Sequence, residues 1–564
     1  MKRSRSISRA DVSTTDDLVS VERPGADLPG AGFNAAIGNT VNPSTHRGGT
    51  LVLDNSGDWD SIDPGNTYVA YAWNFARLYA RTLTTYAAPD GPAGAALVPD
   101  LAADLGRVSD DGLTWTYRLK PNLRMENGAV ITSYMIKHAI ERSASYSPTL
   151  PIGPVYWRTF LTGPDGIATP DPATVVFRLR RPMAEFDYLV SMPQTAPVPP
   201  ECDTGPEYWR QPLSSGPYRI RAYIPGRRLQ LVRNAAWDPA SDPVRRQLAD
   251  AVVVNLNVDA DAIDRRLLTG EVHLAVEGGG VQRRGQAAIL DRPARRSNAD
   301  NPLNGFVWYA AISTAVPPLD NLHCRRAVLY AADHLALQDA FGGPIGGAIA
   351  PTMLPPTVPG APPDGYDPYG FLSRPRGDLE RAAAALQAGG HPGGFATTIS
   401  FRNNRPKEQA AAAALRTSLA RVGIQTELLG YPPGEIDVYP GTPDFVHRHR
   451  LGINITGWGS DWPSGFGFLY AICHGAAIRQ TSNSNISELD DPDVNALLDR
   501  VMLIADAGER AAMHREITER ITAAAAFLPI VHARSLLYRS PVLTNVSVNP
   551  ALQMYDYAQI GLMA

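Results

Sequence analysis

The sequence predicts an α/β protein built of two or three domains. A chain of 564 residues is too long to fold around a single hydrophobic core. Every second residue is large and apolar at positions 113–119, and residues 451–456 are rich in β-branched side chains, so both segments are expected to be strands. Apolar residues recur at helical spacing over residues 71–83. Strand and helix patterns therefore follow one another along the chain.

The elements can be placed in order. A flexible Gly-Gly pair introduces a first strand at residues 48–53, and a Pro-Asp-Gly-Pro turn at residues 89–92 follows the helix at 71–83. Asp111 and Gly112 form the turn of a hairpin that leads into the alternating segment. An Ala-rich helix begins near Lys407 and includes residues 410–419. The Asp-Asp-Pro-Asp sequence at 490–493 favours an N-terminal helix cap over a calcium site.

The N-terminal segment, residues 1–47, is polar and is expected to be disordered. It contains no apolar stretch of the length found in signal peptides and no cysteine that a lipid anchor would modify. No run of apolar residues is long enough to span a membrane. For the sequence as written we expect a cytoplasmic location. A start codon further upstream would instead place the chain outside the cell, associated with the membrane.

Composition excludes several classes of function. The formal net charge is -4 and the pI about 6.3, which gives no indication of nucleic-acid binding. The three cysteines are scattered without a CxxC pair, so neither a zinc site nor a disulfide framework is expected. Phosphate-loop, HExxH and G-x-S-x-G motifs are missing from the sequence. The His-Arg-His sequence at 447–449 favours a solvated loop over a metal site. We therefore expect no metal and no cofactor.

The segment at residues 457–463, Gly-Trp-Gly-Ser-Asp-Trp-Pro, has the clearest chemical signature. It follows a predicted buried strand, and its glycines let a ligand or another backbone come close. Asp461 lies between Trp458 and Trp462, and a carboxylate between aromatic faces suits a cationic amine. The alternative is a loop aspartate that caps the next turn beside two core tryptophans.

A series of short motifs resembles one family in its order. The series begins with Gly-Gly-Thr-Leu at 48–51 and Asp-Pro at 63–64, and continues with Pro-Asp-Leu-Ala at 99–102, Asp-Gly-Leu-Thr-Trp at 111–115, Ser-Gly-Pro-Tyr at 215–218, Val-Gly-Ile at 422–424 and the tryptophan segment. The chain, from about residue 48 to its end, resembles the peptide- and nickel-type solute-binding proteins of ABC importers, the oligopeptide- and dipeptide-binding class.

The resemblance implies a periplasmic-binding-protein-like fold of two α/β lobes joined by a hinge, with an additional domain inserted in the first lobe. Lobe I would comprise residues 48–88, 206–295 and 529–564, the inserted domain 89–205, and lobe II 296–528. The crossovers between lobes would lie at residues 306–310 and 527–531. Ligand would be enclosed when the lobes close.

The resemblance also implies ligand-binding residues. In dipeptide-binding members, an Arg-Pro pair ahead of a helix holds the ligand carboxylate, which matches Arg405 here; a surface arginine at a helix start is the alternative. The aspartate of the tryptophan segment, Asp461, would hold the ligand amine. The remaining candidates are aromatic, and are Trp458, Trp462, Trp308, Tyr309 and Tyr68.

Two functions follow. The first is a solute-binding protein that closes on a peptide-like or amine-bearing molecule and delivers it to ABC permease subunits. The second is a cytosolic biosynthetic enzyme that uses the closed cleft for catalysis on a natural-product-like substrate. Its catalysis would pair Asp461 with an unpartnered group of the first lobe: Asp54, Asp58, Asp60 or Tyr68. We expect a monomer with a small-molecule or peptide ligand, no nucleic acid and no membrane span.

Overall fold

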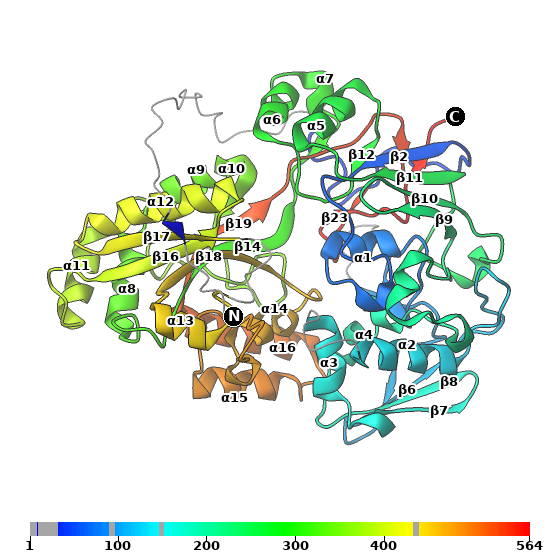
Figure 1. The fold of residues 1–564 in the computed structure, drawn as a ribbon, viewed down its shortest axis with the longest axis horizontal. Coiled ribbons are helices and arrows are strands. Elements are labelled where there is room, and N and C mark those ends of the chain that lie inside the picture. Colours follow the sequence, from blue (N-terminus) through cyan, green and yellow to red (C-terminus); the bar gives the residue numbers. More distant parts are fainter. Residues whose placement is uncertain (1–7, 10–31, 89–95, 146–151, 433–438) are drawn as a thin grey trace, which may run out of the picture. The chain divides into compact units, whose positions relative to one another are not determined.

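The computed structural model describes residues 8–9, 32–88, 96–145, 152–432 and 439–564 (Figure 1). The chain divides into two compact units. Unit 1 comprises Met1–Leu28 and Leu303–Arg534, and unit 2 comprises Pro29–Pro302 and Ser535–Ala564. We expected the divisions at residues 295/296 and 528/529, a few residues earlier. Unit 2 takes in the segments predicted as lobe I and the inserted domain. The turn predicted at residues 89–92 lies outside the described residues.

Unit 1 is built on one mixed sheet. Its strands, in spatial order, are β1 (Ser8–Arg9), β17 (Gln425–Tyr431), β16 (Ala396–Arg402), β18 (Ile453–Gly459), β14 (Leu303–Ile312), β19 (Phe527–Arg534) and β15 (Gly347–Ile349). β16 runs parallel to both β17 and β18, whereas β14 is antiparallel to β18 and β19. The predicted crossover segments are the strands β14 and β19, which pair with each other inside unit 1.

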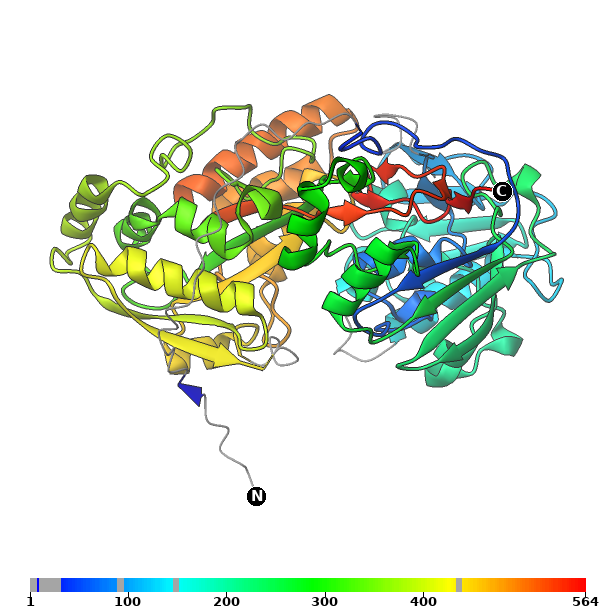
Figure 2. The ribbon, with the colours of Figure 1, turned by 90° about the horizontal axis from the view of Figure 1, so that it is seen from above.

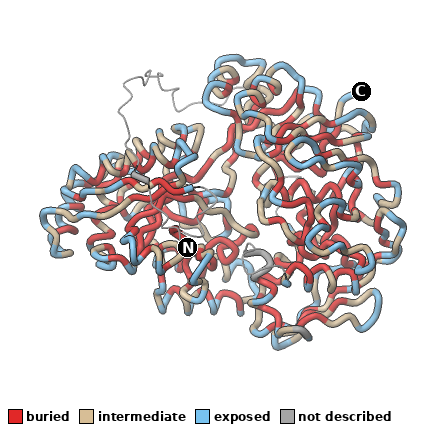
Figure 3. Tube along the Cα trace, viewed as in Figure 1, coloured by how far each residue is buried: buried red, intermediate tan, exposed pale blue. Residues whose placement is uncertain are grey.

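Helices cover this sheet. They are α8 (Leu322–Ala331), α9 (His334–Ala340), α10 (Gly343–Gly346), α11 (Leu379–Ala388), α12 (Pro406–Ala420), α13 (Pro443–His449), α14 (Gly465–Cys473), α15 (Pro492–Val501) and α16 (Ala507–Ala524). Residues of α8, α9, α11 and α12 form one core with strand residues such as Ile399, Phe401 and Ile455. α14 contacts α15 and α16, drawn in orange in Figure 1. Buried residues are continuous along most of β19 and along the whole of α14 (Figure 3).

The described part of unit 2 shows two larger sheets and four strand pairs. The five-stranded sheet has the order β12 (Leu274–Ala275), β2 (Thr50–Asp54), β11 (Ala251–Asn255), β10 (Arg228–Arg233), β9 (Tyr218–Ile224). The four-stranded antiparallel sheet has the order β5 (Arg107–Val108), β6 (Thr114–Arg118), β8 (Thr174–Arg178), β7 (Ile167–Asp171). The pairs are β3 (Thr84–Tyr86) with β4 (Leu97–Pro99), β13 (Ala299–Asp300) with β20 (Leu537–Tyr538), β21 (Leu543–Thr544) with β24 (Gly561–Leu562), and β22 (Val548–Asn549) with β23 (Met554–Tyr555).

The helices of unit 2 are α1 (Ala70–Ala76), α2 (Ser133–Ser145), α3 (Ile152–Phe160), α4 (Phe186–Leu189), α5 (Ala260–Thr269), α6 (Arg283–Leu290) and α7 (Pro293–Arg296). α1 ends earlier than the predicted helix at 71–83. The reason is tertiary: the backbone N–H groups of Ser215 and Gly216 both donate to Tyr79 O, and Tyr218 N donates to Leu78 O. Carbonyls that bind another segment in this way are not available to continue a helix. Within the described residues, no helix has the length and apolarity needed to cross a membrane.

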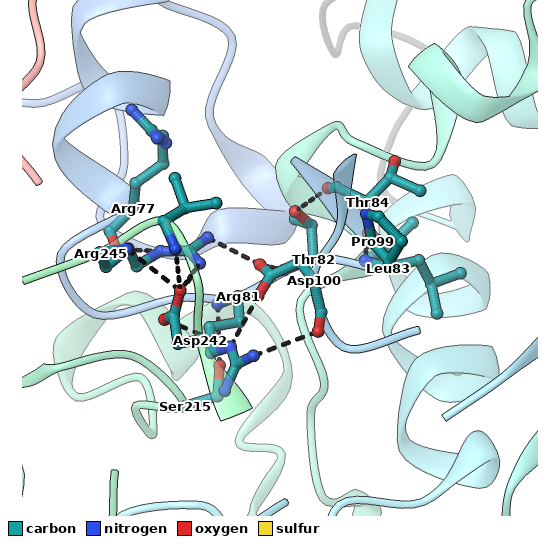
Figure 4. Close-up of polar contacts among 12 residues, drawn as sticks. Arg77, Arg81, Thr82, Leu83, Thr84, Pro99, Asp100, Ser215, Asp242 and Arg245 are labelled. Carbon is teal, nitrogen blue, oxygen red and sulfur yellow. Dashed lines mark hydrogen bonds and ion pairs between the residues drawn. The ribbon is translucent and has the colours of Figure 1, made fainter. Parts of the chain in front are cut away.

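A buried cluster of two arginines and two aspartates joins distant segments of unit 2 (Figure 4). Asp100 accepts from Arg81 Nε at 2.8 Å and from Arg245 Nη2 at 2.8 Å. Asp242 lies 3.3 Å from Arg245 Nη1 and 3.6 Å from Arg81 Nε. Burial alone would raise the pKa of Asp242, but the charges of Arg245 and Arg81 outweigh it and hold that pKa well below its usual value. The cluster ties the chain after α1 to the chain after β4.

Part of the N-terminal segment makes specific contacts, which corrects the expectation of disorder for residues 32–47. Ala36 is fully buried and its N–H donates to Asp300 Oδ1 at 2.9 Å. Val41 forms a β-bridge with Val546 near the C-terminus. The sequence alone could not reveal these contacts, because the residues that make them are several hundred positions apart. Except for residues 8–9, the preceding part lies outside the description.

Candidate functional site

Three parallel strands of unit 1 end at the same edge of the sheet. β16 is parallel to β17 and to β18, so the carboxyl ends of all three strands lie at one edge. Arg405 follows the end of β16, and Asp461 follows the end of β18. The carboxyl edge of parallel strands is where α/β sheets bind ligands. The topology therefore brings the two predicted clamp residues, a cation and an anion, to one edge.

Arg405 occupies the N-cap position of α12, a helix of 15 residues, and is exposed. The positive end of the helix dipole favours an anion at this position. The neighbouring cation, Arg402, is engaged elsewhere, because its Nε donates to the buried Glu408 at 3.0 Å and its Nη2 pairs with the same carboxylate. Of these two arginines, Arg405 is thus the one placed at the helix start with an exposed side chain.

The Gly-Trp-Gly segment is the end of β18 and not a loop, which corrects the expected boundary. β18 continues to Gly459, and its register places Gly457 opposite Trp308 and Gly459 opposite Phe306 on β14. A Cβ on Gly457 would lie 2.9 Å from the Trp308 ring, and one on Gly459 would lie 2.5 Å from the Phe306 ring. The glycines therefore make room for aromatic side chains of the neighbouring strand.

The tryptophan segment is held against α14. Trp458 is half-buried, and its Nε1 donates to Phe468 O at 2.7 Å. Trp462 is 2% exposed and stacks with Phe466, so it supports the segment from within. The N-cap of α14 is Ser464, whose Oγ accepts from Gly467 N at 3.0 Å. The core role considered for the tryptophans thus fits Trp462 better than Trp458.

Asp461 is half-buried, between these two tryptophans in the chain. Its N–H donates to Gly467 O at 3.2 Å, which fixes the backbone of the aspartate against the first turn of α14. The N-cap of the following helix, α14, is Ser464. The prediction that Asp461 faces a cavity between the lobes stays a prediction, because each unit is described by itself.

Trp308 and Tyr309 lie on opposite faces of the unit 1 sheet. Trp308 stacks on Phe341 of the helix-covered core, with ring centroids 5.0 Å apart. Tyr309 is paired with Thr456 in the register, so it shares a face with Trp458. Burial raises the pKa of the Tyr309 hydroxyl far above its usual value. Tyr309 is only 1% exposed, so it lies beneath the face on which Trp458 stands, whereas Trp308 lies on the opposite face.

The face that contains Tyr309 also has a polar network that we did not predict. Ser400 Oγ donates to Asn454 Oδ1 at 2.8 Å, and the Tyr431 hydroxyl lies 3.2 Å from the same oxygen. All three residues are buried. The available signal was Asn454, a polar residue inside a strand otherwise rich in isoleucine. Its partners come from β16 and β17, which only the strand order identifies.

Tyr68 belongs to unit 2. It is half-buried, its N–H donates to Asp60 Oδ2 at 2.6 Å, and its ring contacts Trp73 edge to face. Asp60 also accepts from Thr67 Oγ1 at 2.8 Å. Burial raises the pKa of Asp60, although these hydrogen bonds act in the opposite direction. Asp60 is therefore a structural acceptor that orders the start of α1.

The other first-lobe acids also have partners, which corrects their description as unpartnered. Asp54 is fully buried, accepts from Asn255 Nδ2 at 2.8 Å and lies 3.1 Å from Arg266 Nη1. Burial raises the pKa of Asp54, and Asn255 and Arg266 lower it in part. Asp58 accepts from the Tyr223 hydroxyl at 2.9 Å. These contacts give each carboxylate a structural role.

The predicted site residues of unit 1 neither belong to a metal-binding group nor line a cavity found elsewhere in the unit. Among the described residues, no group of three His, Cys, Asp or Glu side chains could hold a metal ion. The prediction of a loop at residues 447–449 is wrong, because these residues are the end of α13, where His447 Nε2 lies 2.9 Å from Glu488. The acidic segment at 490–493 caps α15 as predicted, since Asp491 accepts from the backbone N–H groups of Asp493 and Val494.

A cavity of about 710 Å³, lined in part by Asp320 and Arg450, contains none of the predicted site residues.

The sequence of this chain is similar to a family of known proteins. Residues 96–480 match the family model of bacterial extracellular solute-binding proteins, family 5. The glutathione-binding protein GsiB of Salmonella typhi is 23% identical over 465 residues, which cover 80% of this chain and 84% of that protein. GsiB of Escherichia coli O157:H7 is 25% identical over 340 residues, which cover 60% of this chain and 62% of that protein.

Solved structures give the same result. The clavulanic acid biosynthesis oligopeptide binding protein 2 is 41% identical, with a TM-score of 0.91 over 95% of this chain and 99% of that one. DppA of Helicobacter pylori, in complex with the peptide STSA, is 20% identical with a TM-score of 0.73 over 92% of this chain and 99% of that one. The murein tripeptide binding protein MppA of Escherichia coli is 17% identical with a TM-score of 0.73 over 93% and 100%. These likenesses confirm the predicted two-lobe α/β binding-protein fold.

Proposed function

Because the chain belongs to the bacterial extracellular solute-binding proteins of family 5, we propose that its solute is a peptide-like molecule with a free ammonium group and a free carboxylate. The observation that carries this proposal is the placement of Arg405 and Asp461 after the carboxyl ends of the adjacent parallel strands β16 and β18. A cation and an anion at one sheet edge match the two charged ends of such a solute.

Each charge has a physical role. The planar guanidinium of Arg405 suits a carboxylate, and the start of α12 adds the positive end of a helix dipole. The carboxylate of Asp461 suits an ammonium group, and Trp458, three positions earlier in the chain, offers an aromatic ring of the kind that excludes water and attracts a cation. Tyr309 lies on the same face of the sheet as Trp458. These four residues are the proposed core of the ligand site in unit 1.

The names of related proteins support the solute class. One relative is named for glutathione, one was solved with the peptide STSA, and one is named for a murein tripeptide. The structure that is 41% identical is named as an oligopeptide binding protein of clavulanic acid biosynthesis. We infer that this chain likewise handles a peptide-like solute in connection with the biosynthesis of a natural product.

Binding without catalysis is the function that the geometry favours. The biosynthetic-enzyme alternative needs a first-lobe group that is poised to transfer a proton. Asp54 and Asp58 accept hydrogen bonds from side chains, and Asp60 accepts from Thr67 and from a backbone N–H. Acids engaged in this way suit a static wall better than a general base.

Native mass spectrometry of the purified protein tests the proposal. We expect a retained solute whose fragmentation identifies both an amine and a carboxylate. Incubation with many equivalents of that solute should return it unchanged. A retained solute without an amine or a carboxylate would overturn the proposed ligand class, and turnover of the solute would establish the enzyme instead.

The proposal also concerns the protein partner and the cellular location. An ABC permease is the partner that a solute-binding protein of this family implies, and co-purification with membrane fractions that contain the permease tests it. The monomeric state and the cellular location stay predictions. Light scattering of the purified protein and fractionation of the native host measure them.

A further inference from the structure

A cavity of about 590 Å³, lined mostly by residues with polar side chains, lies within unit 2, between the N-terminal segment and the C-terminal strands. None of its lining residues is acidic. The side chains that give the cavity its chemistry are those of Thr40, Ser44, Thr45, Arg246, Ser547 and Gln559. Its volume is in the range of cavities that bind small molecules.

The N-terminal wall of the cavity is fixed to the C-terminal wall. Val41 forms a β-bridge with Val546. Asn42 Nδ2 donates to Leu543 O at 2.9 Å, and Ser44 exchanges two hydrogen bonds with Asn545, of 3.0 and 2.9 Å. Figure 2 shows this dark blue segment passing beside the red C-terminal strands. The cavity therefore exists because residues 40–45 pack on the end of the chain.

Arg246 supplies the only formal charge among the lining residues. Its backbone N–H donates to Ala558 O at 2.9 Å, which fixes the position of the residue. The residue is exposed, and its guanidinium forms no ion pair with any described residue. An arginine without an acidic partner, in a cavity without acidic residues, favours an anion with several oxygen acceptors.

Ser547 is the second observation that points to a ligand. The residue is 1% exposed and lines the cavity, and its Oγ has no hydrogen-bond partner among the described residues. A buried hydroxyl without a partner is unfavourable, and because this Oγ is itself covered, a rotation of the side chain toward the cavity would bring it to a ligand oxygen. Thr40 and Thr45 add two further hydroxyl groups from the opposite wall.

We propose that this cavity is a second ligand site, which binds a phosphate group. A phosphate offers enough acceptor oxygens for one guanidinium and several hydroxyls, and the cavity is roomier than the phosphate group alone requires. The source is either inorganic phosphate or a phosphate ester of a hydroxylated molecule. The site lies in unit 2 and is independent of the proposed solute site, which lies in unit 1.

Isothermal titration calorimetry of the full chain at low ionic strength tests the proposal, with inorganic phosphate, glucose 6-phosphate and glucose as probes. We expect one or both phosphates to bind and glucose not to bind. Preference for glucose 6-phosphate identifies an ester site, and equal or stronger binding of the free ion identifies an inorganic phosphate site. Absence of heat at millimolar phosphate would overturn the proposal.

Substitutions locate the binding. Arg246→Gln should weaken phosphate affinity about tenfold or more, whereas Arg227→Gln, at an exposed arginine of the same unit, should leave it unchanged. Ser547→Ala should weaken binding without lowering the melting temperature, because the hydroxyl has no partner to lose. If Arg246→Gln and Arg227→Gln weaken binding equally, or neither does, the phosphate is an adventitious ion only and the proposed site is wrong.

Discussion

Gly457 lies directly opposite Trp308 across β18 and β14, and a Cβ on Gly457 would stand 2.9 Å from the Trp308 ring. Trp308 cannot retreat easily, because its ring stacks on Phe341 with centroids 5.0 Å apart. The strand that leads to Trp458 and Asp461 thus depends on a glycine that leaves room for a neighbouring indole. Packing within unit 1 therefore positions the start of the candidate site.

Two glycine substitutions test this packing. Gly457→Ala should lower the free energy of unfolding by about 2 kcal/mol, because the ring that it meets is packed against the core. Gly459→Ala is the matched control: its Cβ would meet Phe306, which is 38% exposed and can move aside. Denaturant unfolding of both variants measures the difference. Equal losses would contradict the account.

The buried charge cluster of unit 2 predicts a large loss of stability on neutralising one member. Asp100 is fully buried and accepts from Arg81 and Arg245, so Asp100→Asn leaves two buried guanidinium groups with one carboxylate. We expect a loss of about 3–5 kcal/mol. Asp104→Asn, at an exposed aspartate nearby, should change the free energy of unfolding by less than about 0.5 kcal/mol. A small effect at Asp100 would mean that the cluster is not stabilising.

Unit 1 should lose stability as the pH falls from 6.5 toward 4. Burial lowers the pKa of His334, His514 and His532 to about 4 from an ordinary value of 6.5. Because the unfolded chain takes up these protons first, the stability that the neutral histidines contribute is complete above pH 6.5 and is lost on acidification. Each should cost about 2 kcal/mol between pH 7 and pH 5.

Chemical denaturation at several pH values measures this loss. His514→Gln should reduce the pH dependence, since it removes one of these three imidazoles with a lowered pKa, whereas His449→Gln, at an exposed histidine, should leave it unchanged. An unfolding free energy that does not change between pH 7 and pH 5 would show that these histidines are not held neutral.

Local patterns in the sequence were sufficient for several elements. The strand predicted at residues 48–53 is β2, the Ala-rich helix is α12, and the acidic sequence at 490–493 begins α15. Each depends on periodicity or capping within a few neighbouring residues. By contrast, α1 ends early because backbone N–H groups of residues 215–218 donate to the carbonyls of Leu78 and Tyr79. No local pattern contains that information.

The candidate site divides in the same way. The family resemblance predicted Arg405, and the position of Asp461 between two tryptophans predicted that aspartate, but only the parallel order of β16 and β18 places both residues at one edge. Composition could not separate Trp308 from Tyr309, because which face each occupies depends on strand register. The first-lobe acids were misjudged for a related reason. The partners of Asp54 and Asp58 lie about 160 to 220 residues further along the chain.

The central claim is that Asp461 binds the solute ammonium and Arg405 the solute carboxylate. Isothermal titration calorimetry of the retained solute and its N-acetylated form, with the wild-type protein and Asp461→Asn, tests it as a double-mutant cycle. Arg405→Gln with the C-amidated solute forms the second cycle, and Asp444→Asn and Arg448→Gln are exposed controls in unit 1. In each cycle we expect the protein substitution alone, or the solute modification alone, to cost about 3–5 kcal/mol of binding free energy, and the two together to cost little more. If acetylation weakens binding to Asp461→Asn as much as it weakens binding to the wild type, Asp461 does not bind the ammonium group.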